Sequence, residues 1–314
     1  MSKRRSASRP GRLAVIVLAG LLLLAALGLY LSSLMILRDM ATHRVEKLEH
    51  TPETLGLAAE TVRLTSADGI PLQAWYIPAE PARGLVVILH GMDGVDASSF
   101  LPQAEYLHAA GYASLVLDMR AHGRSSGERI GFAFEEPADV CAALDWAAAQ
   151  PELDGRPVAL LGFSMGGATA IRTAAARPDV DSVISVSAFA SMDKMLGQGM
   201  ILMGAPRQLV GMYTPFLRLG LLTLYGVWPA AASPEHDIAA IAPRPVLLVH
   251  GTADGQIPVE QAVQLQQAGG ETVELAIVDG ADHLVFRGDG TGPEDAEFRQ
   301  RILDFLARSL PAPE

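Results

Sequence analysis

Short runs of consecutive apolar residues alternate with longer mixed segments through most of this chain. Apolar runs without polar alternation are typical of strands covered on both faces, and therefore of a parallel sheet wrapped by helices. The pattern predicts six such strands, at residues 85–90, 112–118, 158–163, 181–187, 244–251 and 272–278. The segments around them predict helices over residues 97–110, 136–150, 165–177, 258–268 and 293–309. We therefore expect an α/β fold with a mostly parallel sheet and helices on both faces.

The segment before these strands has a different pattern. Residues 61–78 read TVRLTSADGIPLQAWYIP, with a strand-like run on each side of Asp68 and Gly69. An Asp-Gly pair suits the positive backbone angles of a tight hairpin turn. We expect two antiparallel strands to open a folded domain that covers residues 60–314.

The first part of the chain holds its longest apolar run. Residues 13–37 contain no charged side chain, and about twenty apolar residues suffice to cross the hydrocarbon core of a membrane. The alternative is a cleaved secretory signal, whose apolar region is about 7–15 residues long and ends in small residues. This run is longer and ends in Met35, Ile36 and Leu37, which favours an uncleaved transmembrane anchor.

Charge refines this picture. The chain has a net charge of −11, but five basic residues lie in the first twelve positions, so the remainder carries about −16. A basic leader over residues 1–12 predicts a cytoplasmic N-terminus, and therefore an extracytoplasmic domain joined to the membrane by a tether over residues 38–59. The acidic domain disfavours nucleic-acid binding. Cys141 is the only cysteine, which excludes an internal disulfide and a cysteine-based metal site.

An insertion interrupts the alternation of strands and helices between residues 187 and 244. Its apolar part, about residues 192–232, is rich in Met, Leu and aromatic residues but is broken by glycines, Pro206, Pro215, Arg207 and Arg218. Three interpretations are open: a helical cap over a binding site, ordinary core helices, or a second membrane span. The interruptions count against a span. The position, directly after a strand, favours the cap.

Ser164 is the candidate nucleophile. It lies in GFSMGG, residues 162–167, where an apolar strand gives way to an alanine-rich helix. Ser164 could simply be the N-cap of that helix, but a serine between glycines at a strand-to-helix junction also matches a nucleophile elbow. The glycines allow backbone segments to approach where a Cβ atom would clash. A serine hydroxyl needs a base and an orienting acid to react.

Both partners follow in the loops after later strands. Asp254 comes after the strand at residues 244–251, and His283 comes after the strand at residues 272–278. In open α/β sheets, ligands bind beyond the carboxyl ends of the strands, so these loops should meet near Ser164. The sequence therefore predicts a Ser164, Asp254 and His283 triad. Its oxyanion hole should use the backbone N–H groups of Met165 and of Met92, in the loop after the first parallel strand.

Five motifs together carry a family resemblance. HGMDG (90–94), DMRAHGRSSG (118–127), GFSMGG (162–167), HGTADGQIP (250–258) and GADH (280–283) resemble those of the α/β-hydrolase superfamily, in its membrane-anchored and serine-aminopeptidase-like esterase branches. The resemblance covers about residues 60–310. It implies the α/β-hydrolase fold and acyl transfer to water, and it implies a structural hydrogen-bonding role for His122.

The expected function is hydrolysis of a carboxylic ester with a hydrophobic acyl group, by an acyl-enzyme mechanism that needs no metal or cofactor. A peptidase or an acyl thioesterase with the same fold is an alternative, and a non-catalytic membrane-tethered binding protein is a third. The expected partners are a small-molecule substrate and the membrane, and the sequence indicates no particular oligomeric state.

Overall fold

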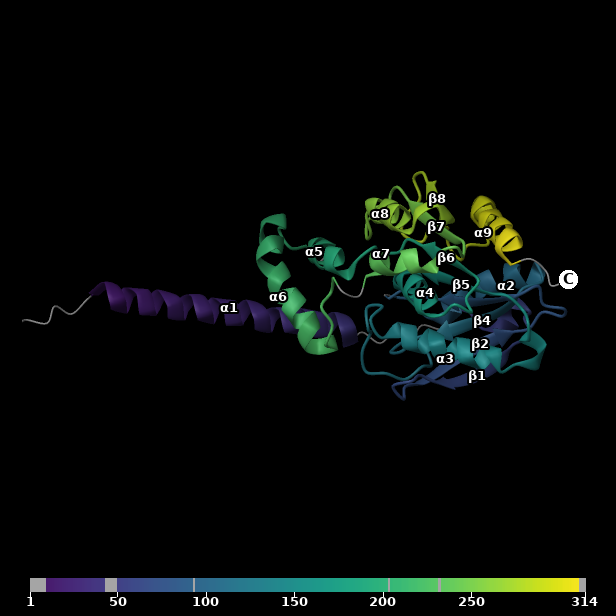
Figure 1. The fold of residues 1–314 in the computed structure, drawn as a ribbon, viewed down its shortest axis with the longest axis horizontal. Helices are drawn as coiled ribbons and strands as arrows, with labels where there is room; N and C mark the ends of the chain where they lie inside the picture. Colours follow the sequence, from purple (N-terminus) through teal and green to yellow (C-terminus); the bar gives the residue numbers. More distant parts are fainter. Residues whose placement is uncertain (1–9, 43–49, 93, 203, 231–232, 311–314) are drawn as a thin grey trace, which may run out of the picture.

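An eight-stranded sheet forms the centre of the computed structural model, in the order β1-β2-β4-β3-β5-β6-β7-β8 (Figure 1). The structure describes residues 10–42, 50–92, 94–202, 204–230 and 233–310. β1, β2 and β4 are antiparallel neighbours, whereas every other pairing in the sheet is parallel. The strands are β1 (Glu60–Thr65), β2 (Pro71–Ile77), β3 (Leu85–Leu89), β4 (Ala113–Asp118), β5 (Val158–Phe163), β6 (Ser182–Val186), β7 (Val246–Gly251) and β8 (Val273–Val278). The six parallel strands predicted from the apolar runs are confirmed to within two residues at each end.

Helices cover both faces of this sheet. Apolar side chains of α3, α4 and α8 pack on one face, and those of α2 and α9 pack on the other. The helices are α1 (Pro10–Thr42), α2 (Leu101–Ala109), α3 (Glu136–Ala148), α4 (Met165–Ala176), α5 (Met192–Leu202), α6 (Arg207–Tyr225), α7 (Pro234–Asp237), α8 (Glu260–Gly269) and α9 (Ala296–Ser309). Short 3-10 helices lie at Pro52–Leu55, Ala97–Phe100, Pro151–Leu153, Ile238–Ile241, Gly270–Thr272 and Pro293–Asp295.

The predicted hairpin opens the domain. β1 pairs with β2 in a register that sets Thr65 opposite Pro71, and Gly69 in the turn has a φ of 86°. That angle lies in the left-handed region that glycine adopts without a steric penalty.

The segment predicted as a tether, residues 38–59, has helical structure at its start and near its end. α1 continues five residues past the apolar run, to Thr42, and its last turn is fixed to the domain because the Ile130 N–H donates to the Ala41 carbonyl at 2.7 Å. The chain is folded again by Pro52, which is buried in a 3-10 helix. Residues 43–49, and residues 1–9 of the basic leader, lie outside the described part of the chain.

The insertion forms two helices, α5 and α6, in keeping with the helical cap interpretation. They are followed by the short helix α7, which the apolar pattern did not predict. Figure 1 shows α6 crossing the end of α1 that is nearer to the domain, with α5 beside it. Within the described residues, α1 is the one helix that is long and apolar enough to cross a membrane. Hereafter the segment from Met192 to Trp228 is called the cap.

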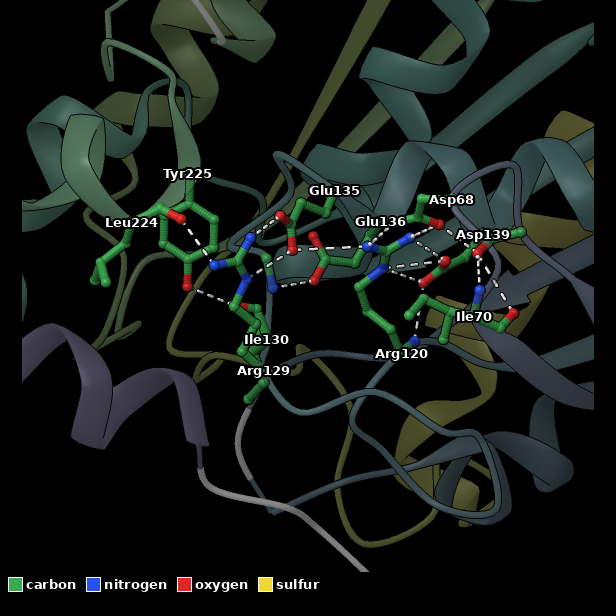
Figure 2. Close-up of polar contacts among 12 residues, drawn as sticks. Asp68, Ile70, Arg120, Arg129, Ile130, Glu135, Glu136, Asp139, Leu224 and Tyr225 are labelled. Carbon is green, nitrogen blue, oxygen red and sulfur yellow. Dashed lines mark hydrogen bonds and ion pairs between the residues drawn. The ribbon is translucent and has the colours of Figure 1, made fainter.

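A network of ion pairs and hydrogen bonds joins the cap to the domain (Figure 2). The buried Arg120 binds Asp139 at 2.7 Å and Asp68, from the β1–β2 turn, also at 2.7 Å. Arg129 continues the network by pairing with Glu135 and donating to the Leu224 carbonyl at the end of α6. The neighbouring Tyr225 hydroxyl donates to the Ile130 carbonyl at 2.7 Å. The adjacent residues Arg129 and Ile130 therefore both hold the end of α6 in place.

Glu136 lies inside this network and predicts a pH-dependent stability. Burial first, and then the charge of Asp139, raise the pKa of Glu136 to about 7, while its carboxyl accepts the Gly131 N–H at 2.5 Å. The folded state therefore holds a proton that the unfolded state has released, and stability falls as pH rises from about 4.5 to 7. Relative to the wild type, Glu136→Gln should gain about 2–3 kcal/mol of unfolding free energy as pH rises from 5 to 8, because glutamine has no proton to release.

Urea unfolding in detergent at the two pH values measures this gain. Glu105→Gln makes the same exchange at an exposed glutamate of α2 and is the matched control, because it removes no buried carboxyl group. A pH-independent effect of Glu136→Gln would contradict the assignment.

Candidate active site

Ser164 stands on a strained turn between β5 and α4. Its φ of 55° and ψ of −117° are unfavourable for a residue with a Cβ atom, and its N–H donates to the Val186 carbonyl at 2.8 Å. Ser164 occupies the N-cap position of α4, but its side chain makes no capping hydrogen bond. The glycines around it have a steric reason. A Cβ on Gly162 would lie 2.2 Å from the Gly166 oxygen, and one on Gly166 would lie 2.3 Å from the Leu89 oxygen.

Asp254 and His283 come together from the loops after β7 and β8. His283 Nδ1 lies 2.8 Å from Asp254 Oδ2, and the backbone N–H groups of Gln256 and Ile257 donate to Asp254 Oδ1 at 2.8 and 2.9 Å. Burial alone raises the pKa of Asp254, but these hydrogen bonds, with one from His250, hold it well below its usual value. Asp254 is therefore a carboxylate at all physiological pH values, and it can orient and stabilise a protonated His283.

His250 is a further partner of Asp254 that the sequence did not single out. This fully buried histidine is the second-last residue of β7, with Nε2 at 3.1 Å from Asp254 Oδ2 and 2.9 Å from the Ile257 carbonyl oxygen. His250 thus connects the Asp254 carboxylate to the loop that contains Ile257, and this contact fixes the orientation of the carboxylate toward His283. The only signal in the sequence is its position four residues before Asp254, within HGTADGQIP.

The loop after β3 carries Met92, the other predicted oxyanion residue. His122 is buried, and its Nε2 and Nδ1 lie 2.7 Å from the Met92 carbonyl and 2.8 Å from the Arg120 carbonyl. His122 thus holds the Met92 peptide in place, in keeping with the structural role that the resemblance implies. The neighbouring His90 accepts the Met119 N–H, and burial lowers its pKa well below the usual value.

Four of the predicted site residues line one cavity of about 300 Å³. Ser164, His283, Met92 and Met165 all line it, and the first turn of α4 presents backbone N–H groups that have no partner within the helix. No hydrogen bond joins Ser164 to His283 among the described residues, and such contacts often tighten only when substrate binds. The remaining lining is nearly all apolar, from α1, α5, α6 and the loops after the strands.

Sequence comparison places the chain among known proteins. The family model of the serine aminopeptidases, S33, matches residues 80–237, which is half of the chain. The protein YfhR of Escherichia coli K12 is 26% identical over 260 residues, which cover 81% of this chain and 82% of YfhR.

Solved structures agree on the fold. The esterase Pf2001 of Pyrococcus furiosus has a TM-score of 0.68 and 26% identity, over 86% of this chain and 97% of the esterase. Est1E of Butyrivibrio proteoclasticus, solved with ferulic acid bound, has a TM-score of 0.60 and 20% identity over 79% of this chain and 99% of its own, which shows the fold alone. Together with the mostly parallel sheet, these matches establish that the chain is an α/β-hydrolase and belongs to the serine aminopeptidase S33 family.

Proposed function

We propose that this protein is a serine esterase in which Ser164 is the nucleophile, His283 the general base and Asp254 the residue that orients His283. The observation that carries the proposal is the meeting of Ser164, on its strained elbow, and the Asp254-bound His283 at one apolar cavity. A hydroxyl on such a turn is exposed toward the substrate, while the base approaches from another strand end.

The reaction proceeds in two half-reactions. Ser164 Oγ attacks the ester carbonyl carbon as His283 takes the hydroxyl proton, and the negative charge that develops on the carbonyl oxygen is stabilised by the Met92 and Met165 N–H groups. Collapse of this intermediate breaks the bond to the alcohol, which leaves with the proton from His283. Water then attacks the acyl-enzyme with His283 again as base, and this step releases the acid and restores Ser164.

The lining of the cavity favours an apolar ester over a peptide. Apart from Ser164 and His283, Gln256 is the one polar side chain among its described lining residues. An aminopeptidase must bind the ammonium group at the substrate's N-terminus, for which a carboxylate is the usual partner. None of the described lining residues supplies one.

Acyl chain length tests this proposal. Each buried CH₂ group contributes about 0.8 kcal/mol, so kcat/KM for p-nitrophenyl esters should rise about two orders of magnitude from acetate to hexanoate. Aminoacyl p-nitroanilides and acyl thioesters, assayed beside the esters, represent the two alternative activities. A preference for aminoacyl amides, or a kcat/KM independent of acyl chain length, would refute the proposed esterase function.

We further propose that α1 is an uncleaved membrane anchor with a cytoplasmic N-terminus. The apolar run of 25 residues and the basic residues before it support this proposal. Leu37 and Ala41, near the end of α1, are buried against the domain, so removal of α1 as a signal would uncover the core. Digestion of the domain by protease added outside intact spheroplasts tests this orientation, and its protection there would contradict it.

A further inference from the structure

The end of α1 is built into the catalytic domain. Leu37 and Ala41 are 2% and 3% exposed, and the Tyr30 hydroxyl lies 2.9 Å from Thr223 Oγ1 on α6. α6 approaches α1 closely at Gly220, where an added Cβ would lie 2.7 Å from Leu37 Cδ1. A helix that served only as a membrane anchor would need no such close packing against the domain.

The same end of α1 forms a wall of the cavity that contains Ser164. Ile36, Leu37 and Met40 line it together with apolar residues of the cap. An acyl group bound at Ser164 would therefore touch the helix that continues into the membrane.

The exposed apolar surface gathers at this end of the molecule. Among the described residues, every large exposed hydrophobic side chain except Ile277 lies on α1 or in the cap. Those of the cap are Leu202, Leu209, Met212, Leu219, Leu222 and Trp228. In Figure 1, α5 and α6 lie beside the end of α1 and away from α2 and α9. A large exposed apolar patch of this kind marks a surface that meets a membrane or a partner.

The length of α1 sets the depth of the cavity relative to the membrane. About twenty residues cross the hydrocarbon core, so a span that begins at Leu13 ends near Ser32. At a rise of about 1.5 Å per residue, Met40 then lies only about 12 Å farther along the helix. The cavity wall formed by α1 is therefore at the level of the lipid headgroups.

We propose that the substrate is a membrane-resident lipid ester, and that its acyl chain reaches Ser164 from the bilayer along the face of α1 that lines the cavity. The proposal rests on the esterase function above. The bilayer covers the apolar outer face of the cap, and the buried end of α1 guides the acyl chain toward the nucleophile.

Two matched substitutions on α1 test the acyl path. Met40 lines the cavity, whereas Met35 is 72% exposed and does not line it. The full chain, reconstituted in phosphatidylcholine vesicles, is assayed with a fluorogenic palmitoyl ester in the bilayer and with water-soluble p-nitrophenyl acetate. Met40→Trp crowds the cavity along the path of a long acyl chain, so it should slow palmitoyl ester hydrolysis at least about tenfold more than it slows acetate hydrolysis. Met35→Trp should change neither rate.

The outcomes separate this proposal from the esterase function. If Met40→Trp leaves palmitoyl ester hydrolysis unchanged, or slows both esters equally, α1 does not shape the acyl path and the proposal is overturned. If the wild type cleaves neither ester, the esterase function itself fails.

A second arm of the experiment identifies the source of the lipid. The palmitoyl ester is placed either in the vesicles that carry the protein or in separate, protein-free vesicles. Access from the bilayer predicts hydrolysis in the first case, and at least about tenfold slower hydrolysis in the second because the ester must first cross water. Equal rates in the two arrangements would overturn entry from the membrane.

Discussion

Replacement of Ser164 by alanine is expected to lower kcat for ester hydrolysis by about 10⁵- to 10⁶-fold, with little change in the fold. Alanine keeps the Cβ and therefore the same backbone strain at a φ of 55°, but it removes the oxygen that forms the acyl-enzyme. Steady-state assays with a p-nitrophenyl ester measure the loss, and circular dichroism checks the fold.

Ser187 provides a matched control for this loss. It is also a serine with positive φ, at 51°, directly after the neighbouring strand β6, and its buried hydroxyl has no hydrogen-bond partner in the described part of the chain. Ser187 does not line the cavity, so Ser187→Ala should keep activity within about threefold of the wild type, since no hydrogen bond is lost. Activity of Ser164→Ala equal to that of Ser187→Ala would exclude Ser164 as the nucleophile.

Replacement of Asp254 by asparagine is expected to lower kcat by about 10³- to 10⁴-fold. Among the described residues, four groups face the Asp254 carboxylate: the His283 and His250 rings and the N–H groups of Gln256 and Ile257. The amide of an asparagine at residue 254 must turn its NH₂ group toward one of these donors. If the NH₂ group faces His283, it favours the wrong imidazole tautomer. If it faces the N–H groups of the backbone, the hydrogen bonds to the loop are lost.

The kcat of Asp254→Asn, compared with that of Asp279→Asn, tests this role. Asp279 is an exposed aspartate directly after β8 that accepts a hydrogen bond from Thr252, so its amide variant should keep wild-type kcat. If Asp254→Asn retained kcat within about tenfold of the wild type, the proposed role of Asp254 would be wrong.

The sequence predicted the sheet well because its signal is local. Short continuous apolar runs such as residues 158–163 are typical of strands covered on both faces, and the structure places that run as β5. The glycines at residues 162 and 166 likewise indicated a tight approach of backbone segments, which the 2.2 Å and 2.3 Å Cβ distances explain.

Contacts between distant segments left no comparable signal. The charged residues Arg38 and Asp39 indicated the end of the apolar run, yet the helix continues because Leu37 and Ala41 pack against the domain and Ala41 accepts the Ile130 N–H. His250 looked like an ordinary strand residue, since its partner atoms belong to a loop whose path only the tertiary structure defines. The α1 wall of the cavity depends on α6, more than 160 residues away in the chain.

Covalent labelling tests the central claim most directly. A fluorophosphonate reacts with a serine that is activated as a nucleophile, so the full-length protein should carry a single adduct. Peptide mass spectrometry should locate it on Ser164, and Ser164→Ala and His283→Ala should not be labelled. A folded wild-type protein that takes no label, or takes it on another serine, would contradict the assignment of Ser164 as the nucleophile.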